Sequence, residues 1–147
     1  MRYLEDLTVG ERILTGPVVV TEAGILAFAR QFDPQPMHVD RKAATVGPLG
    51  GLSASGWHTA AMVMRLIVDA DPLDGVPWLG LGVDGLRWLS PVRPGDTITV
   101  EIEIVAITPS RAKQSHGIVR TGITARNQHG EAVMTLSPNL WIPRRPL

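Results

Sequence analysis

The sequence predicts an α+β protein in which an antiparallel sheet wraps around one central, buried helix. Residues 57–70 form a run that is apolar on nearly every side, which is typical of a helix surrounded by protein. Residues 96–107 alternate between apolar and polar side chains, which indicates a strand with one wet face and therefore an antiparallel sheet. A sheet wrapped around the helix buries both apolar surfaces at once.

The first part of the chain predicts an edge strand followed by a helix. Residues 11–20 are rich in β-branched side chains, but Pro17 cannot donate to a ladder, so this strand is expected at a sheet edge. Thr21 is a suitable N-cap for the next segment, whose apolar stripe runs to Phe32. Asp33 precedes a proline and is pushed away from the α region, so the helix is expected to end there.

The segments on either side of the buried helix complete the predicted fold. Residues 33–38 are expected to form a stiff, non-helical loop, because their two prolines fix or restrict the backbone angles. A short helical turn is expected from Asp40, and residues 47–56 are rich in Gly and Ser. Strands near residues 113–126 and 132–142 flank a turn and are expected to pair as a hairpin. This order of elements is that of the hot-dog architecture.

Composition narrows the possible functions. The 147 residues fit a single domain, and 14 basic against 14 acidic side chains give no general attraction to nucleic acid or an anionic membrane. The absence of cysteine excludes thiol nucleophiles, Cys zinc sites and disulfides. No uncharged apolar run reaches the roughly 18 residues of a membrane span. We therefore expect a cytoplasmic protein without a metal or cofactor.

The stiff loop carries the residue types needed for acid–base chemistry. Asp33 and His38 stand at its two ends, and a carboxylate and an imidazole that share one water can take a proton and return one. The alternative is a proline-rich turn with both side chains solvated. A fully extended loop would also hold the two side chains far apart, and the sequence alone leaves this open.

A glycine opens the buried helix. Gly56 stands at its start, where the first N–H groups have no partner in the helix and carry partial positive charge. A thioester carbonyl placed there would be polarised and its enolate-like transition state stabilised. The alternative is that glycine at this position only permits close packing.

These motifs together resemble the MaoC-like dehydratase family, which includes the (R)-specific enoyl-CoA hydratases. The family pattern D-x-N-P-x-H is matched at Asp33, Pro36 and His38, and Gly56 keeps the spacing of eighteen residues after the histidine. Residues 90–98 (SPVRPGDTI) resemble the family's P-V-x-x-G-D segment. The similarity covers residues 1–147 as a single domain of this type.

The resemblance implies a function and a site. It implies a hot-dog fold, a homodimer or dimer of dimers, and an acyl-CoA or acyl-carrier thioester substrate bound along the subunit interface. It also implies that Asp33 and His38 activate the water and that the Gly56 N–H holds the thioester oxygen. Around this centre we expect substrate contacts from Gln35, Gly51, Ser55, Trp57 and His58. Core packing is the competing role for Trp57 and His58.

Two departures from the family pattern keep other functions open. Gln35 replaces the motif's Asn, and Met64 stands where such hydratases often carry a serine that orients the Asp. A hot-dog thioesterase is one alternative, although the central helix offers only His58, Arg65 and Asp69 and no Glu. A catalytically impaired acyl-CoA-binding protein is the other. A G-x-G-x-x-G match at residues 80–85 is set aside, because no helix is expected after it.

Overall fold

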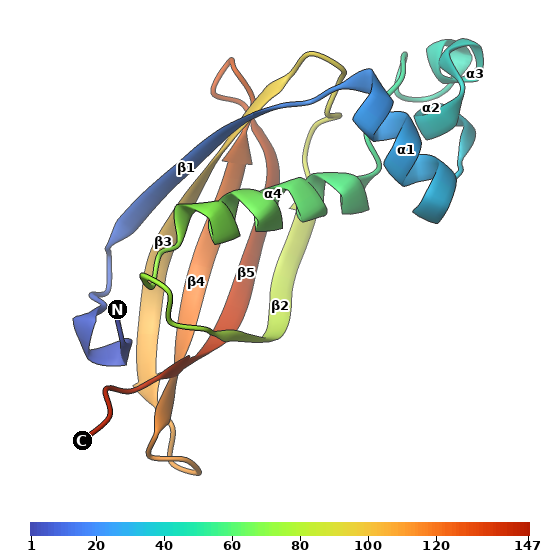
Figure 1. The fold of residues 1–147 in the computed structure, drawn as a ribbon. Helices are drawn as coiled ribbons and strands as arrows, with labels where there is room; N and C mark the ends of the chain where they lie inside the picture. Colours follow the sequence, from blue (N-terminus) through green and yellow to red (C-terminus); the bar gives the residue numbers. More distant parts are fainter.

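The computed structural model describes residues 1–147, and the chain forms ten helices and strands. In chain order they are η1 (Leu4–Asp6), β1 (Arg12–Val19), α1 (Glu22–Phe32), α2 (Pro36–Val39), α3 (Arg41–Val46), α4 (Gly56–Ala70), β2 (Leu79–Trp88), β3 (Thr97–Pro109), β4 (His116–Arg126) and β5 (Ala132–Pro143). Figure 1 shows α4 lying across one face of a single sheet, with α1, α2 and α3 gathered near one end of α4. Both chain termini lie toward the opposite end of the sheet.

The sheet has the antiparallel arrangement that the alternation in the sequence predicted. Its strand order is β1-β3-β4-β5-β2, and every neighbouring pair is antiparallel. β1 lies at one edge, as Pro17 indicated, and its register on β3 shifts between Thr15 and Val18, around that proline. The predicted hairpin of residues 113–126 and 132–142 is the β4–β5 pair. The α+β hot-dog prediction is therefore confirmed.

The core lies between α4 and the inner face of the sheet. Alternate residues of β3, including Ile98 and Val100, are fully buried, while Thr99 between them is exposed. From α4, Val63 and Ile67 enter the same core, one turn apart on one side of the helix. The opposite side of α4 is not covered, and Trp57 is 60% exposed. The prediction that this helix is buried on every side is therefore wrong within a single copy of the chain, because one sheet covers only one side of α4.

The loop expected to be non-helical contains a turn of helix. Gln35 is extended, as the following proline requires, but Pro36 occupies the first helical position of α2. The N–H of the first helical residue has no partner within the helix, so a proline, which has no N–H, loses nothing at this position. Its fixed φ also suits the start of a helix, and Pro36 therefore begins a helix here instead of preventing one. The predicted cap is present, since the Thr21 hydroxyl accepts from the Gly24 N–H. The predicted turn after Asp40 is α3.

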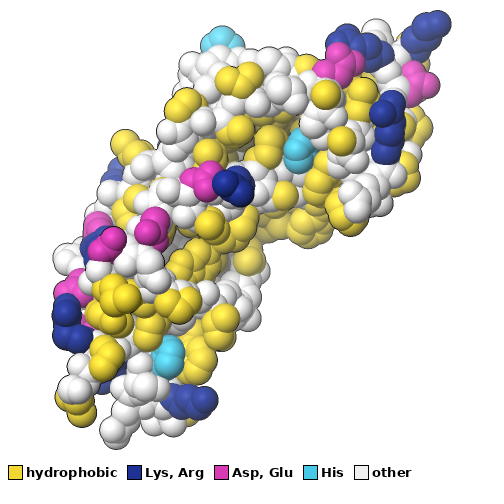
Figure 2. Space-filling view, viewed as in Figure 1, with side chains coloured by type: hydrophobic (Ala, Val, Ile, Leu, Met, Phe, Trp, Pro, Cys, Tyr) yellow, Lys and Arg dark blue, Asp and Glu magenta, His cyan; other side chains and the backbone are white.

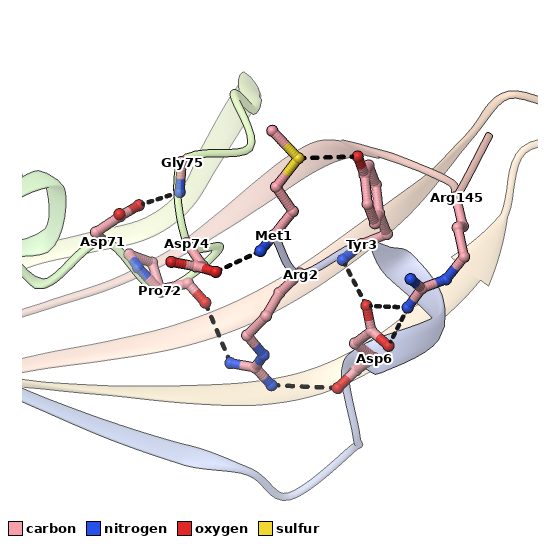
Figure 3. Close-up of polar contacts among 9 residues, drawn as sticks. All are labelled: Met1, Arg2, Tyr3, Asp6, Asp71, Pro72, Asp74, Gly75 and Arg145. Atoms are coloured by element: carbon pink, nitrogen blue, oxygen red, sulfur yellow. Dashed lines mark hydrogen bonds and ion pairs between the residues drawn. The ribbon is translucent and has the colours of Figure 1, made fainter.

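The N-terminal segment is fastened to the end of the sheet that lies far from α1 (Figure 3). Arg2 donates to the Pro72 carbonyl at 3.1 Å, which joins the chain start to the turn after α4. Arg145 donates to both carboxylate oxygens of Asp6, at 2.6 and 2.7 Å. A second apolar cluster that includes Leu4 and Leu73 is packed behind these contacts. None of the helices is both long and apolar enough to cross a membrane.

Replacing Ile98 with alanine tests the core. Ile98 is fully buried at the centre of the sheet–helix contact, so Ile98→Ala is expected to lower the free energy of unfolding by about 2–5 kcal/mol. Thr99→Ala, the adjacent exposed position of the same strand, is expected to cost about 1 kcal/mol or less. Urea denaturation at one protein concentration measures both, and equal losses would contradict this assignment of the core.

Candidate active site

Asp33 and His38 lie side by side, although four residues lie between them in the sequence. Asp33 is the C-cap of α1, and His38 belongs to α2, whose single turn brings the imidazole back toward the carboxylate. The Asp33 Oδ2 and His38 Nε2 atoms are 3.5 Å apart. An extended loop would have separated them, so the helical turn begun by Pro36 is what forms the pair.

The Asp33 carboxylate is held by two neutral donors. The Ser55 hydroxyl donates to Oδ2 at 2.7 Å, and the Gln35 side-chain amide donates to Oδ1 at 2.7 Å. The Ser55 hydrogen bond, followed by that of Gln35, holds the pKa of Asp33 below its usual value. Partial burial opposes this effect, and the nearby His38 adds a smaller contribution in the same direction as the hydrogen bonds. Asp33 is therefore a carboxylate at neutral pH.

His38 is buried and its ring orientation is fixed from behind. Only 7% of the residue is exposed, and Nδ1 lies 2.7 Å from the Ser53 carbonyl oxygen. A carbonyl can only accept, so Nδ1 carries the proton in this hydrogen bond. In the neutral ring, Nε2 then has a free lone pair facing the Asp33 carboxylate. A water lying beside both acceptors on the cavity side can donate one hydrogen to each.

The pair opens into a cavity of about 350 Å³. Asp33 and His38 line it on one side, and Thr59, Trp57 and Trp88 contribute to its other walls. The Ser53 hydroxyl at its border is buried and has no hydrogen-bond partner. No group of three His, Asp or Glu side chains lies close enough together to hold a metal ion.

Gly56 begins α4 at the wall of the same cavity. The Trp88 indole N–H donates to the Gly56 carbonyl at 2.9 Å, so the tryptophan lies directly against this residue. A Cβ atom at position 56 would come within 2.5 Å of the Trp88 ring, which explains why only glycine fits. The N–H groups of this first turn have no partner in the helix and are therefore available to an oxygen in the cavity.

The structure brings some of the predicted substrate-contact residues to the cavity and leaves others away from it. Trp57 lines the cavity, while Ser55 and Gln35 reach it only through Asp33. Gly51 is not part of the cavity wall. Its carbonyl accepts a hydrogen bond from the Arg93 guanidinium instead. His58 is turned toward α1, where its ring stacks on Phe28 with centroids 4.9 Å apart, and burial lowers its pKa.

Two features of the site were not predicted from the sequence: the role of Ser55 and the position of Trp88. The orienting hydroxyl was sought at position 64 in the helix, but it comes from Ser55, the residue just before α4. Trp88 was not among the predicted site residues, yet it contacts Gly56 and lines the cavity. Ser55 was predicted as a substrate contact, but nothing in the sequence reveals that its hydroxyl reaches a carboxylate 22 positions earlier.

A second cavity, almost entirely apolar, lies farther along α4. It measures about 380 Å³ and extends between the helix and the inner face of the sheet, with Met64 and Ile67 on the helix side. Gly80 to Val83 of β2 form its rim. In Figure 2, apolar side chains gather in the hollow of the face that carries α4.

Known proteins share this fold and sequence. Residues 6–127 match the family described as MaoC like domain. A MaoC-like dehydratase from Rhodospirillum rubrum is 44% identical in its crystal structure, with a TM-score of 0.91 and 99% of each chain covered. The (R)-hydratase PhaJ1 from Pseudomonas aeruginosa is 26% identical, with a TM-score of 0.79 over 99% of this chain and 88% of that one.

A curated relative points to the same class of enzyme. The 3-hydroxybutyryl-CoA dehydratase of Methylorubrum extorquens is 28% identical over 113 residues, which is 76% of this chain and 69% of the relative. These findings confirm the resemblance drawn from the Asp33–His38 and Gly56 motifs. The chain therefore belongs to the MaoC-like dehydratase family and is a hydro-lyase with a hot-dog fold.

Proposed function

We propose that this protein adds water across the double bond of a trans-2-enoyl-CoA thioester, or catalyses the reverse dehydration, with Asp33 and His38 as the acid–base pair. The observation that carries the proposal is the 3.5 Å approach of the Asp33 carboxylate and the His38 imidazole at the wall of a cavity. The hydratase and the CoA-thioester dehydratase among its relatives support the choice of substrate.

The proposed reaction begins with a water held between Asp33 Oδ2 and His38 Nε2. The water oxygen bonds to C3 of the substrate while one of its protons passes to the pair, and the C2–C3 π electrons move toward the thioester carbonyl. The Gly56 N–H donates to the carbonyl oxygen as negative charge develops there. The pair then returns a proton to C2. Hydroxyl and proton arrive from the same side, so the addition is syn.

The geometry around Ser55 supports an active enzyme over an impaired one. That expectation rested on Met64 at the position where a serine orients the catalytic Asp, and the Ser55 hydroxyl provides this hydrogen bond from a different place. Gln35 likewise donates to the carboxylate. No observation favours a thioesterase, since Asp69 of α4 is paired with Arg65 on an exposed face and does not line the cavity.

We also propose that the working form is a homodimer joined along β2. Nine of the ten residues of this edge strand are exposed, and Leu79, Leu81 and Val83 are each more than half exposed. An edge strand of this length with apolar side chains is normally covered, since it offers unpaired backbone groups to any other strand. The uncovered side of α4 lies next to the same edge and extends the apolar surface. A second copy presents the same surface in return.

Removing either member of the pair tests the chemistry. Asp33→Asn and His38→Gln keep the side-chain size but remove proton transfer, so kcat for hydration of crotonyl-CoA is expected to fall by about 10²–10⁴-fold. Loss of the enoyl-thioester absorbance measures the rate. His129→Gln, in the exposed turn between β4 and β5, is the control and should keep its rate. Turnover unchanged in either active-site variant would refute the mechanism.

Ser55→Ala tests the electrostatics of the site. The Ser55 hydrogen bond is the largest cause of the lowered pKa of Asp33, so its loss is expected to raise that pKa. Hydration needs the carboxylate form, and activity is lost as pH falls through the pKa of Asp33. The acidic limb of the kcat/KM profile should therefore move to higher pH. Ser115→Ala, near an exposed loop, should leave the limb in place, and an unmoved limb in Ser55→Ala would argue against the assigned role.

Leu81→Lys tests the dimer. A lysine in the middle of β2 places a charge in the proposed interface, so sedimentation analysis should show monomers at concentrations where the unchanged protein is dimeric. Leu14→Lys is the matched control, because Leu14 is an exposed leucine of β1, the opposite edge strand. If Leu14→Lys dissociated the dimer and Leu81→Lys did not, the interface would lie along β1, and the proposed β2 interface would be refuted.

A further inference from the structure

The residues that orient the Asp33–His38 pair belong to one short stretch of chain. Ser53 accepts from His38 through its carbonyl, and Ser55 donates to Asp33 through its hydroxyl. Both belong to the segment of residues 49–56, which we term the strap; it has no regular secondary structure until α4 begins at Gly56. A segment without its own hydrogen-bond ladder must be held in place by other parts of the protein.

One side chain contacts three carbonyls of the strap. The guanidinium of Arg93, in the turn between β2 and β3, donates to the Gly51 carbonyl at 2.8 Å and the Leu52 carbonyl at 3.3 Å. It also donates to the Leu49 carbonyl. The Arg93 guanidinium forms no ion pair with a carboxylate, and its donors are directed at these backbone oxygens.

The backbone beside Arg93 reinforces the attachment. The Ala54 N–H donates to the Val92 carbonyl at 2.8 Å, so the strap is fixed on both sides of Ser53. Arg93 is itself anchored, because its N–H donates to the Asp96 carboxylate at 2.8 Å. Gly51 also approaches this side chain closely, since a Cβ at that position would lie 3.2 Å from the guanidinium. The turn and the strap therefore form one rigid unit.

We infer that Arg93 is a positioning residue for the reaction: it fixes the strap so that the Ser53 carbonyl and the Ser55 hydroxyl hold His38 and Asp33 in register with each other. Arg93 lines neither cavity, so it acts only through Ser53 and Ser55. The catalytic part of this inference rests on the hydration proposed above. It assigns a role to Gly51, whose carbonyl belongs to the support of the site and not to its substrate-binding wall.

The chemistry of the side chain explains why arginine is needed. Three carbonyls spread along the strap require a planar group with several donors in fixed directions, and a guanidinium has this form. A lysine at the same position has a single ammonium and can satisfy only part of the set. Displacement of a catalytic group by about 1 Å is enough to reduce a rate about 100-fold. Loss of the support should therefore lower kcat while leaving substrate binding nearly intact.

The first measurement uses the purified, full-length protein. Arg93→Ala is expected to lower kcat for crotonyl-CoA hydration by about 10–100-fold with KM changed by less than about threefold, and Arg93→Lys should lie between it and the unchanged enzyme. Arg12→Ala is the matched control, because that guanidinium is exposed and pairs with Glu101 and Glu103 on the outside of the sheet. Its kcat should stay within about twofold of the unchanged enzyme. A kcat for Arg93→Ala equal to that of Arg12→Ala would overturn the inference.

The second measurement does not depend on any activity. The His38 Nδ1 proton, hydrogen-bonded to the Ser53 carbonyl in a buried position, should give a protected signal in proton–nitrogen NMR. That signal is expected to weaken or shift in Arg93→Ala and to persist in Arg12→Ala; an unchanged signal would overturn the inference. If the unchanged protein fails to hydrate enoyl-CoA, the proposed function falls while this signal still decides the role of Arg93. Arg93→Lys carries both measurements if the alanine variant does not fold.

Discussion

The hydrogen bonds that join residues 33–38 to the strap hold the whole site together. The Ser55 hydroxyl donates to Asp33, and the Ser53 carbonyl accepts from His38, both at a distance of 2.7 Å. Each bond links the segment that follows α1 to the segment that precedes α4. Packing of the long helices alone could not hold the two side chains together, because Asp33 follows the last turn of α1 and His38 belongs to the single turn of α2. The two bonds turn an Asp and a His on a short connection into a pair that faces one cavity.

The fold supplies the rigid surroundings that these bonds require. α4 is seated by Val63 and Ile67 on the buried face of β3, so its first residue, Gly56, has a fixed place relative to the sheet. The Trp88 indole at the end of β2 binds the carbonyl of that same glycine. The start of the helix is thus held from the core and from the sheet edge. A helix terminus fixed in this way can present its N–H groups without reorganisation.

Periodicity and turn chemistry made most of the fold predictable, because both are local properties of the sequence. The alternation of Ile98 and Val100 with polar neighbours is a property of one strand, and it correctly gave an antiparallel sheet. Pro36 was misjudged because proline both stops a helix and begins one, and the choice depends on where the helix starts. The Asp33–His38 pairing followed from the motif, but its geometry depended on that turn.

The contacts that sequence reasoning missed join residues far apart in the chain. Ser55 reaches Asp33 over 22 positions, and Arg93 reaches Gly51 over 42. Neither contact leaves a periodic trace, since each involves one side chain and a segment without regular structure. The exposed side of α4 shows the converse limit: an all-round apolar helix indicates burial, but it does not say whether the same chain or a second copy provides the cover.

The electrostatics of Asp33 show why neutral donors surround the carboxylate. Partial burial raises the pKa of Asp33, and the imidazole of His38 lowers it, but the hydrogen bonds from Ser55 and Gln35 are the larger causes and they set the net direction. The ionised state of Asp33 therefore depends little on whether His38 is protonated. In the proposed reaction, the imidazole gains and loses a proton while the carboxylate stays charged beside it. Without these hydrogen bonds, burial would act to raise the pKa of Asp33, and only the neighbouring His38 would oppose it.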